Sequence, residues 1–395
     1  MNLGVNGRYM SASDDFIVFG APDIRQAEID EVVESLEAGW LGTGPKVARF
    51  ERDFASYQGV REEMVAALNS CTAALHVSMI AAGLGPGDEV ITTAMTFCAT
   101  INAIIHAGAT PVLADIDDST LNLDPVEIEG RITERTMAIL PVHFAGHPCD
   151  MDAIMDIAAR HRLKVIEDCA HAIETTYKGK KAGTFGDFGC FSFYVTKNVV
   201  TGEGGMVVAQ REEDIARIKV LSLHGMSKDA WHRFGDEGYK HYRVTEAGFK
   251  YNMMDLQAAI GIHQLSRISA AHKRREQIWN RYNDAFSSLP VVTPPLADHG
   301  CRHAFHLYTL RIPGKEAGCT RDQFLERMAA QGIGVGVHYL SIPDHPYYQR
   351  RYGWVGQDYP RAFRFGQETV SLPLSPKLTE AEVGRIIETV HDSLC

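Results

Sequence analysis

The chain has 395 residues, of which 45 % are hydrophobic and 23 % are charged, as is ordinary for a soluble globular protein. That length favours two domains over one. The formal net charge of −11 at pH 7 argues against a nucleic-acid-binding surface.

Short apolar runs alternate with helical patterns between about Met64 and Ala209. The runs predict strands at Met64–Leu68, Glu89–Thr92, Pro111–Asp115, Met137–Val142, Lys164–Asp168, Gly189–Tyr194 and Gly205–Ala209. The pieces between them predict helices at Thr72–Gly83, Cys98–Ala107 and Met151–Arg162. This alternation predicts an α/β fold with a mostly parallel sheet covered on both faces. Ligands of such sheets bind at the carboxyl ends of the strands.

The rest of the chain predicts a smaller α+β domain. Its expected elements are a long helix at Met254–Ser287, an antiparallel strand at His303–Leu310 and helices at Thr320–Gln331 and Thr379–Ser393. We therefore predict a large α/β domain with an N-terminal arm at residues 1–275 and a small domain at residues 276–395.

The cysteines and the N-terminus bear on cellular location. The eight cysteines form no CxxC pair and several lie in apolar runs, so we expect reduced thiols and a cytoplasmic protein. Met1–Asp15 has no apolar segment typical of a signal peptide, and no apolar run in the chain is long enough for a membrane span. We expect no membrane association.

The turn Asn69–Thr72 follows the first predicted strand and opens a helix. Ser70 is a good N-cap, and the free N–H groups of the first helical turn, together with the helix dipole, can bind a phosphate group. The alternative is a plain helix cap. The turn contains no Walker lysine and no GxGxxG, which argues against a nucleoside triphosphate or a dinucleotide.

Two reactive side chains follow neighbouring strands of the predicted sheet. Asp168 ends one strand, and Lys197 comes shortly after another that ends at Tyr194. A lysine can form an imine with the aldehyde of pyridoxal 5'-phosphate (PLP), and an aspartate can keep the pyridine nitrogen protonated, which makes the ring an electron sink. The alternatives are a helix N-cap for Asp168 and a solvated loop lysine for Lys197.

Aromatic and histidine residues lie near the same edge of the sheet. Phe97 can stack on a flat cofactor ring or be an ordinary core residue. His143 and His147 suggest a metal site, but Gly146 and Pro148 flank His147, so no helix presents the two imidazoles on one face. We predict no metal.

These residues resemble those of the DegT/DnrJ/EryC1/StrS family, the PLP-dependent nucleotide-sugar aminotransferases. The resemblance runs from Gly39–Gly44 to Ser371–Leu374, and its most specific parts are Asn69–His76, Glu167–Ala172, Phe191–Phe193, Lys197–Asn198, Gly202–Gly205 and Gly248–Met253. It implies the aspartate-aminotransferase fold (PLP fold type I) and a homodimer with active sites at the subunit interface.

The resemblance also implies roles for individual residues. Lys197 would be the Schiff-base lysine, and Asp168 would pair with the pyridine nitrogen. His171 would lie beside the ring hydroxyl and Phe97 against the ring face. The phosphate would be held by Cys71, Thr72 and Ser192, with Asn252 reaching it from the neighbouring subunit. His224 and His338 would line the sugar pocket. Independently of the resemblance, Arg233 and Lys250 lie in one irregular segment, residues 231–250, that could bind the pyrophosphate of a sugar nucleotide or could be a solvated surface loop.

One segment departs from the family pattern. Many relatives read Gly-Tyr-Asn-Tyr-Arg where this chain has Gly-Phe-Lys-Tyr-Asn at residues 248–252, so either Lys250 or Asn252 could make the cross-subunit contact. The variant resembles members that act at the sugar 4-position, such as the 4-amino-4-deoxy-L-arabinose synthases.

The expected reaction is transfer of the amino group of L-glutamate to a keto-sugar on a nucleotide diphosphate, with a 4-keto group and with pyridoxamine 5'-phosphate as the intermediate. Two half-reactions on one site predict ping-pong kinetics. The alternatives are an aminotransferase for a 3-keto-sugar or a keto-cyclitol, and a regulatory protein that binds PLP without turnover. A dehydratase of the same family is disfavoured because those relatives replace the lysine that is present here at position 197.

Overall fold

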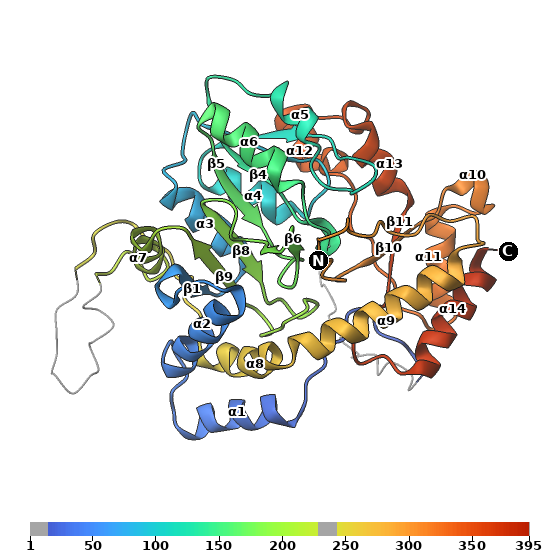
Figure 1. Cartoon of the computed structure of the whole chain (residues 1–395), viewed down its shortest axis with the longest axis horizontal. Coiled ribbons are helices and arrows are strands. Elements are labelled where there is room, and N and C mark those ends of the chain that lie inside the picture. The colour runs from blue at the N-terminus through green and yellow to red at the C-terminus, as the bar shows by residue number, and fades with distance from the viewer. Residues whose placement is uncertain (1–14, 228–242, 395) are drawn as a thin grey trace, which may run out of the picture.

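The computed structural model describes residues 15–227 and 243–394. A sheet with helices on both faces forms the centre of the molecule (Figure 1). A second group of elements lies around the C-terminal end of the long helix α9 (Ile268–Phe286). The strands of this sheet are β1 (Val65–Leu68), β2 (Glu89–Thr93), β3 (Thr110–Ala114), β4 (Thr136–Leu140), β5 (Lys164–Asp168), β8 (Phe188–Ser192) and β9 (Gly205–Ala209). Their order is β1-β9-β8-β5-β4-β2-β3; β9 is antiparallel to both its neighbours and the other pairs are parallel. The predicted mostly parallel α/β sheet is confirmed.

Both faces of this sheet are covered by helices. Those of the first part of the chain are α1 (Gln26–Glu37), α2 (Pro45–Gln58), α3 (Cys71–Ala81), α4 (Cys98–His106), α5 (Pro125–Glu129), α6 (Met151–His161), α7 (Glu212–Leu221) and α8 (Asp255–Ser266). In β1, Ala66 and Leu68 point to the core beneath α3, α4 and α7, whereas Val65 and Ala67 point to the core beneath α2 and α8. The strands are continuously apolar because neither face meets water.

The second part of the chain builds its own core. Its elements are α9 (Ile268–Phe286), β10 (Tyr308–Arg311), α10 (Gly314–Ala317), α11 (Arg321–Ala330), α12 (Pro346–Tyr352), α13 (Pro360–Glu368), β11 (Thr369–Leu372) and α14 (Glu380–Leu394). Side chains of α9, α11, α14 and the antiparallel pair β10–β11 pack together around Trp279, Tyr308 and Phe324. The predicted domain boundary at residue 275 falls inside α9 and stays a prediction.

The single helix predicted at Met254–Ser287 is wrong, because the chain turns at Arg267 (φ −108°, ψ 12°) and forms α8 and α9. The guanidinium of Arg267 donates to the Glu28 carboxylate and to the Asp23 carbonyl, and Gln264 Nε2 donates to the same two groups at 2.9 Å. This anchor holds α8 against α1 and redirects α9 toward the second part of the chain.

The strand predicted at His303–Leu310 is also shorter than expected, since the observed strand is Tyr308–Arg311. Before it, the N–H groups of Ala304 and His306 donate to the carbonyls of Gly146 and Ala145 rather than to a neighbouring strand. The alternating pattern has another cause: this irregular segment packs into the interior beside the loop that follows β4. Among the described residues, no helix has both the length and the apolarity needed to cross a lipid bilayer.

Candidate active site

A cavity of about 690 Å³ opens at the carboxyl ends of the parallel strands. It is lined by residues that follow β1, β2, β4, β5 and β8, and by residues 336–339 from the second part of the chain. Eight of the predicted site residues line it: Cys71, Thr72, Phe97, Asp168, His171, Ser192, Lys197 and His338. The residues predicted to follow the ends of the strands therefore lie together at one place in the fold.

Three predicted residues lie elsewhere, and a fourth is outside the described residues. His224 ends the turn after α7, Lys250 bridges to Leu223, and neither lines the cavity. Asn252 bridges to β1 at Leu68, and Arg233 lies outside the described residues. The side-chain oxygen of Asn252 is buried and has no hydrogen-bond partner in the described part of the chain. The roles assigned to these four residues stay predictions.

Asp168 lies at the closed end of the cavity, and only 4 % of it is exposed. Its Oδ1 accepts the N–H of Ala170 at 3.0 Å, and its Oδ2 accepts the hydroxyl of Thr100 at 2.8 Å. Burial raises the pKa of Asp168, whereas these two hydrogen bonds and the charge of Lys197 act to lower it. The carboxylate is thus a fixed acceptor that can pair with a cationic N–H group of a ligand.

Lys197 follows β8 and points into the same cavity. Burial lowers its pKa from 10.5 to about 8, and the negative charge of Asp168 opposes this shift. An amine with this pKa is deprotonated in a sizeable fraction of molecules near neutral pH. Lys197 can therefore act as a nucleophile or as a base, which an ordinary solvated lysine does poorly.

His171 is held as a neutral ring. The N–H of Ala145 donates to its Nδ1 at 3.1 Å, so the proton lies on Nε2, which is 3.1 Å from the hydroxyl oxygen of Tyr339. Burial, with the nearby charge of Lys197, lowers the pKa of His171 well below its usual value. Since His171 donates to Tyr339, the hydroxyl hydrogen of Tyr339 is free to donate to a ligand.

His306 is fixed by the residue that follows Lys197. Asn198 Nδ2 donates to Glu174 Oε2 at 2.8 Å and to the Ala304 carbonyl at 2.9 Å, so its Oδ1 accepts from His306 Nδ1 at 3.0 Å. The other ring nitrogen of His306 is consequently an acceptor. Thr100 and His306 were not predicted from the sequence, although helical periodicity from Phe97 could have identified Thr100.

The start of α3 forms a seat for an oxyanion. The Ser70 hydroxyl caps the helix by accepting the N–H of Ala73 at 3.1 Å. In the described part of the chain, the N–H groups of Cys71 and Thr72 have no acceptor, and these two residues line the cavity. A Cβ at Gly205 would lie 2.4 Å from the Ser70 carbonyl carbon, so only glycine lets β9 pass this close. The free N–H groups and the helix dipole favour a phosphate here.

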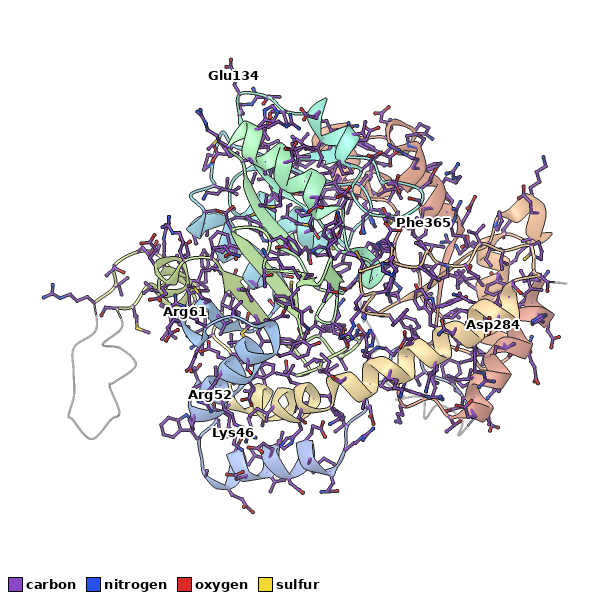
Figure 2. All side chains as sticks on the ribbon, in the orientation of Figure 1. Lys46, Arg52, Arg61, Glu134, Asp284 and Phe365 are labelled. Atoms are coloured by element: carbon purple, nitrogen blue, oxygen red, sulfur yellow. The ribbon has the colours of Figure 1, made fainter. Side chains whose placement is uncertain are left out.

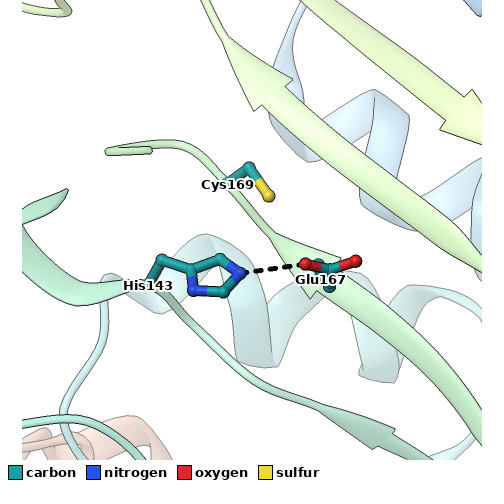
Figure 3. Close-up of side chains that lie close together, drawn as sticks. All are labelled: His143, Glu167 and Cys169. Atoms are coloured by element: carbon teal, nitrogen blue, oxygen red, sulfur yellow. Dashed lines mark hydrogen bonds and ion pairs between the residues drawn. The ribbon is translucent and has the colours of Figure 1, made fainter. Parts of the chain in front are cut away.

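A buried polar cluster supports the end of β5 behind the cavity (Figure 3). Side-chain atoms of His143, Glu167 and Cys169 lie within 4.8 Å of one another, a grouping that could suggest a metal ion. However, the Glu167 carboxylate accepts from His143 Nε2 at 3.0 Å and from the N–H groups of Gly183, Phe185 and Gly186 at 2.8 Å each. His143 Nδ1 accepts the N–H of Cys149 at 3.0 Å. The atoms of His143 and Glu167 that could ligate a metal are thus engaged in hydrogen bonds that join β5 to the loops around it. We therefore assign the cluster a structural role.

The chain is similar over nearly its whole length to known aminotransferases. Residues 22–391 match the model of the DegT/DnrJ/EryC1/StrS aminotransferase family. The chain is 50 % identical over 379 residues to the spore coat polysaccharide biosynthesis protein SpsC of Bacillus subtilis, covering 95 % of this chain and 97 % of that protein.

Two solved structures are also similar. The PLP form of the sugar aminotransferase Spr1654 of Streptococcus pneumoniae, described as putative, has a TM-score of 0.89 and 34 % identity over 96 % of this chain and 98 % of that one. PseC of Helicobacter pylori, an aminotransferase involved in pseudoaminic acid biosynthesis, has a TM-score of 0.87 and 28 % identity over 96 % of this chain and 99 % of that one.

Proposed function

The chain belongs to the DegT/DnrJ/EryC1/StrS aminotransferase family, and we propose that it transfers the amino group of L-glutamate to a nucleotide-diphosphate-linked keto-sugar. The protein is a PLP-dependent sugar aminotransferase with the aspartate-aminotransferase fold. We further propose that the acceptor carries a 4-keto group and that the enzyme is cytoplasmic. The observation that carries this function is the convergence of Lys197 and Asp168 in one cavity.

The donor groups of the cavity fit PLP. The seat at the start of α3 suits its phosphate, and the exposed face of Phe97 suits its ring. The buried carboxylate of Asp168 can accept from a protonated ring nitrogen, and the Tyr339 hydroxyl, which accepts from His171, can donate to the ring hydroxyl. When bound, PLP supplies an electron sink and carries the amino group between the two substrates.

Lys197 and Asp168 have separate roles in the proposed reaction. Lys197 Nζ binds the cofactor covalently at rest and, once free, moves a proton between the substrate carbon and the cofactor. Its lowered pKa suits both tasks, because each requires a neutral amine. Asp168 keeps the positive charge on the ring nitrogen, and the enclosure of the cavity limits access of water to the reacting atoms.

The sugar substrate is proposed on different grounds. SpsC belongs by its name to polysaccharide biosynthesis, and PseC to pseudoaminic acid biosynthesis. By analogy, we propose that this chain makes an amino sugar for a polysaccharide or lipopolysaccharide. His338 lines the cavity, and its Nδ1 is 2.9 Å from Ser371 Oγ. We therefore propose His338 as a contact to the sugar substrate.

We also propose a homodimer. Helix α1 is attached to the body by Lys46 Nζ, labelled in Figure 2, which lies 2.8 Å from Glu31 Oε1. Apolar side chains at helical spacing on α1 and just after it are each more than 40 % exposed: Ile29, Val33, Leu36 and Trp40. A stripe of this kind is typical of a protein–protein interface. A second copy of the chain would also offer a partner group to the unsatisfied oxygen of Asn252.

A spectroscopic experiment tests the reaction. L-Glutamate added to the purified holoenzyme should convert the absorbance of bound PLP to that of the pyridoxamine form, and a panel of keto-sugar nucleotides should restore it. Mass spectrometry identifies the aminated product. Lys197→Ala should lose the absorbance band of the covalently held cofactor and about 10²–10⁴-fold of the rate. Lys180→Ala, which removes an exposed lysine outside the cavity, should behave like the parent.

The panel includes 3-keto-sugar nucleotides and a keto-cyclitol. Restoration of the spectrum by one of these, and by no 4-keto-sugar nucleotide, would replace the proposed acceptor. A holoenzyme whose spectrum does not respond to L-glutamate would contradict the proposed donor. Retention of the covalent band in Lys197→Ala would refute the role of this lysine.

A further inference from the structure

The first turn of α4 lines the proposed cofactor site and contacts the carboxylate of Asp168. Phe97, the N-cap of α4, lines the cavity, and Thr100 lies three residues further along the same turn. The Thr100 hydroxyl is 2.8 Å from Asp168 Oδ2 and 2.7 Å from the hydroxyl of Thr96. All three polar groups are in the interior, since Thr96 is 2 % exposed and Thr100 1 %.

The directions of these hydrogen bonds follow from the chemistry of the groups. An ionised carboxylate only accepts, so Thr100 donates its single hydroxyl proton to Asp168. The oxygen of Thr100 is then left as an acceptor, and Thr96 must be the donor to it. Such a chain polarises each hydroxyl in the same sense, which strengthens the bond to the carboxylate in a low-dielectric interior.

We propose that Thr100, supported by Thr96, is a positioning residue that keeps Asp168 ionised and aimed at the ring nitrogen of the cofactor. The inference rests on the role proposed above for Asp168. A hydroxyl that donates to a carboxylate stabilises its charged form against the cost of burial. Without it, Asp168 would tend to take up a proton and would no longer hold the ring nitrogen in its cationic form.

Thr100 supplies what Lys197 cannot supply throughout the reaction. The positive charge of Lys197 also favours the ionised form of Asp168, but that charge is lost whenever the amine becomes neutral to act as a nucleophile or a base. The hydroxyl of Thr100 does not titrate. It therefore holds the carboxylate in the same state while Lys197 changes its protonation.

The test uses the holoenzyme with bound PLP and the variants Thr100→Val and Thr100→Ser. The matched control is Thr92→Val, because Thr92 is equally buried but donates its hydroxyl to the Leu140 carbonyl at 2.7 Å. The measurements are the absorbance of the bound cofactor against pH, its dissociation constant, and the single-turnover rate with L-glutamate.

Thr100→Val should slow the single turnover about tenfold to a hundredfold, as expected for loss of a hydrogen bond to a charged group. It should also change the pH dependence of the absorbance and leave the affinity for L-glutamate unchanged. Thr100→Ser should restore the parental behaviour, and Thr92→Val should retain it. Thr96→Val, which keeps the Thr100–Asp168 bond, should give a smaller decrease in rate. It replaces Thr100→Val as the test variant if Thr100→Val does not fold.

Asp168→Asn separates failure of this inference from failure of the proposed function. If Asp168→Asn is slow while Thr100→Val matches the parent in spectrum and rate, the inference is overturned and the role of Asp168 stands. If Asp168→Asn itself keeps the parental spectrum and rate, the proposed pairing with the ring nitrogen fails. Equal slowing in Thr100→Ser and Thr100→Val would also overturn the inference, because the hydroxyl would then have no part in the effect.

Discussion

Replacing Lys197 by methionine should stabilise the cofactor-free protein at neutral pH, although it destroys the proposed catalytic amine. Methionine keeps a side chain of similar length, and the change removes an ammonium group whose burial is unfavourable. Protein active sites commonly carry such a stability cost in return for reactivity.

The magnitude follows from the pKa of the lysine. Burial lowers the pKa of Lys197 from 10.5 in the unfolded chain to about 8 in the folded one. At 1.36 kcal/mol for each whole step of pKa, the charged form of Lys197 destabilises the folded state by about 3 kcal/mol. Between pH 8 and pH 10.5 the unfolded state binds more protons than the folded one, so the free energy of unfolding of the parent rises with pH in this window. The advantage of the variant is full below pH 8 and falls to about 1 kcal/mol at pH 10.

Urea unfolding of apo parent and apo Lys197→Met, followed by tryptophan fluorescence at pH 7 and pH 10, measures this difference. Groups common to both proteins titrate in the same way and cancel in the comparison. An advantage of the same size at both pH values would show that the gain comes from packing and not from charge. No advantage at pH 7 would mean that the amine is solvated, which would refute the burial of Lys197 in the folded protein.

Three further predictions concern other parts of the molecule. Arg275→Met should lower the free energy of unfolding by about 3–5 kcal/mol, because it leaves the buried Glu174 carboxylate without its cation, and adding Glu174→Gln should recover much of that loss; urea unfolding of both variants checks this. Phe97→Ala should weaken PLP binding by about 0.5–1.5 kcal/mol through loss of ring stacking, and an unchanged dissociation constant in a cofactor titration would contradict this role. Val33→Glu places a charge in the exposed apolar stripe and should shift the proposed dimer toward monomer in light scattering, whereas a stable dimer would exclude this stripe from the interface.

Much of this architecture could be predicted from the sequence, because the large sheet is built from local patterns. Each predicted strand from Met64 to Ala209 overlaps an observed one, since apolar runs buried on both faces are distinctive. The common location of Asp168 and Lys197 followed from the rule that carboxyl ends of parallel strands share one edge.

The parts that could not be predicted depend on contacts between distant residues. The break at Arg267 is set by side chains of α1, more than 200 residues away in sequence. His306 enters the cavity from the second part of the chain, although the alternation of its segment predicted a strand and no cavity contact. The contacts expected of Asn252 and Lys250 concern a second subunit and stay predictions.

The cavity is closed on one side by His338 and Tyr339, and that segment is held by hydrogen bonds between Gly336 and Ser371 in β11. Nearly the whole polypeptide must therefore leave the ribosome before this wall exists. We therefore expect the cofactor to bind only after translation is complete or nearly so.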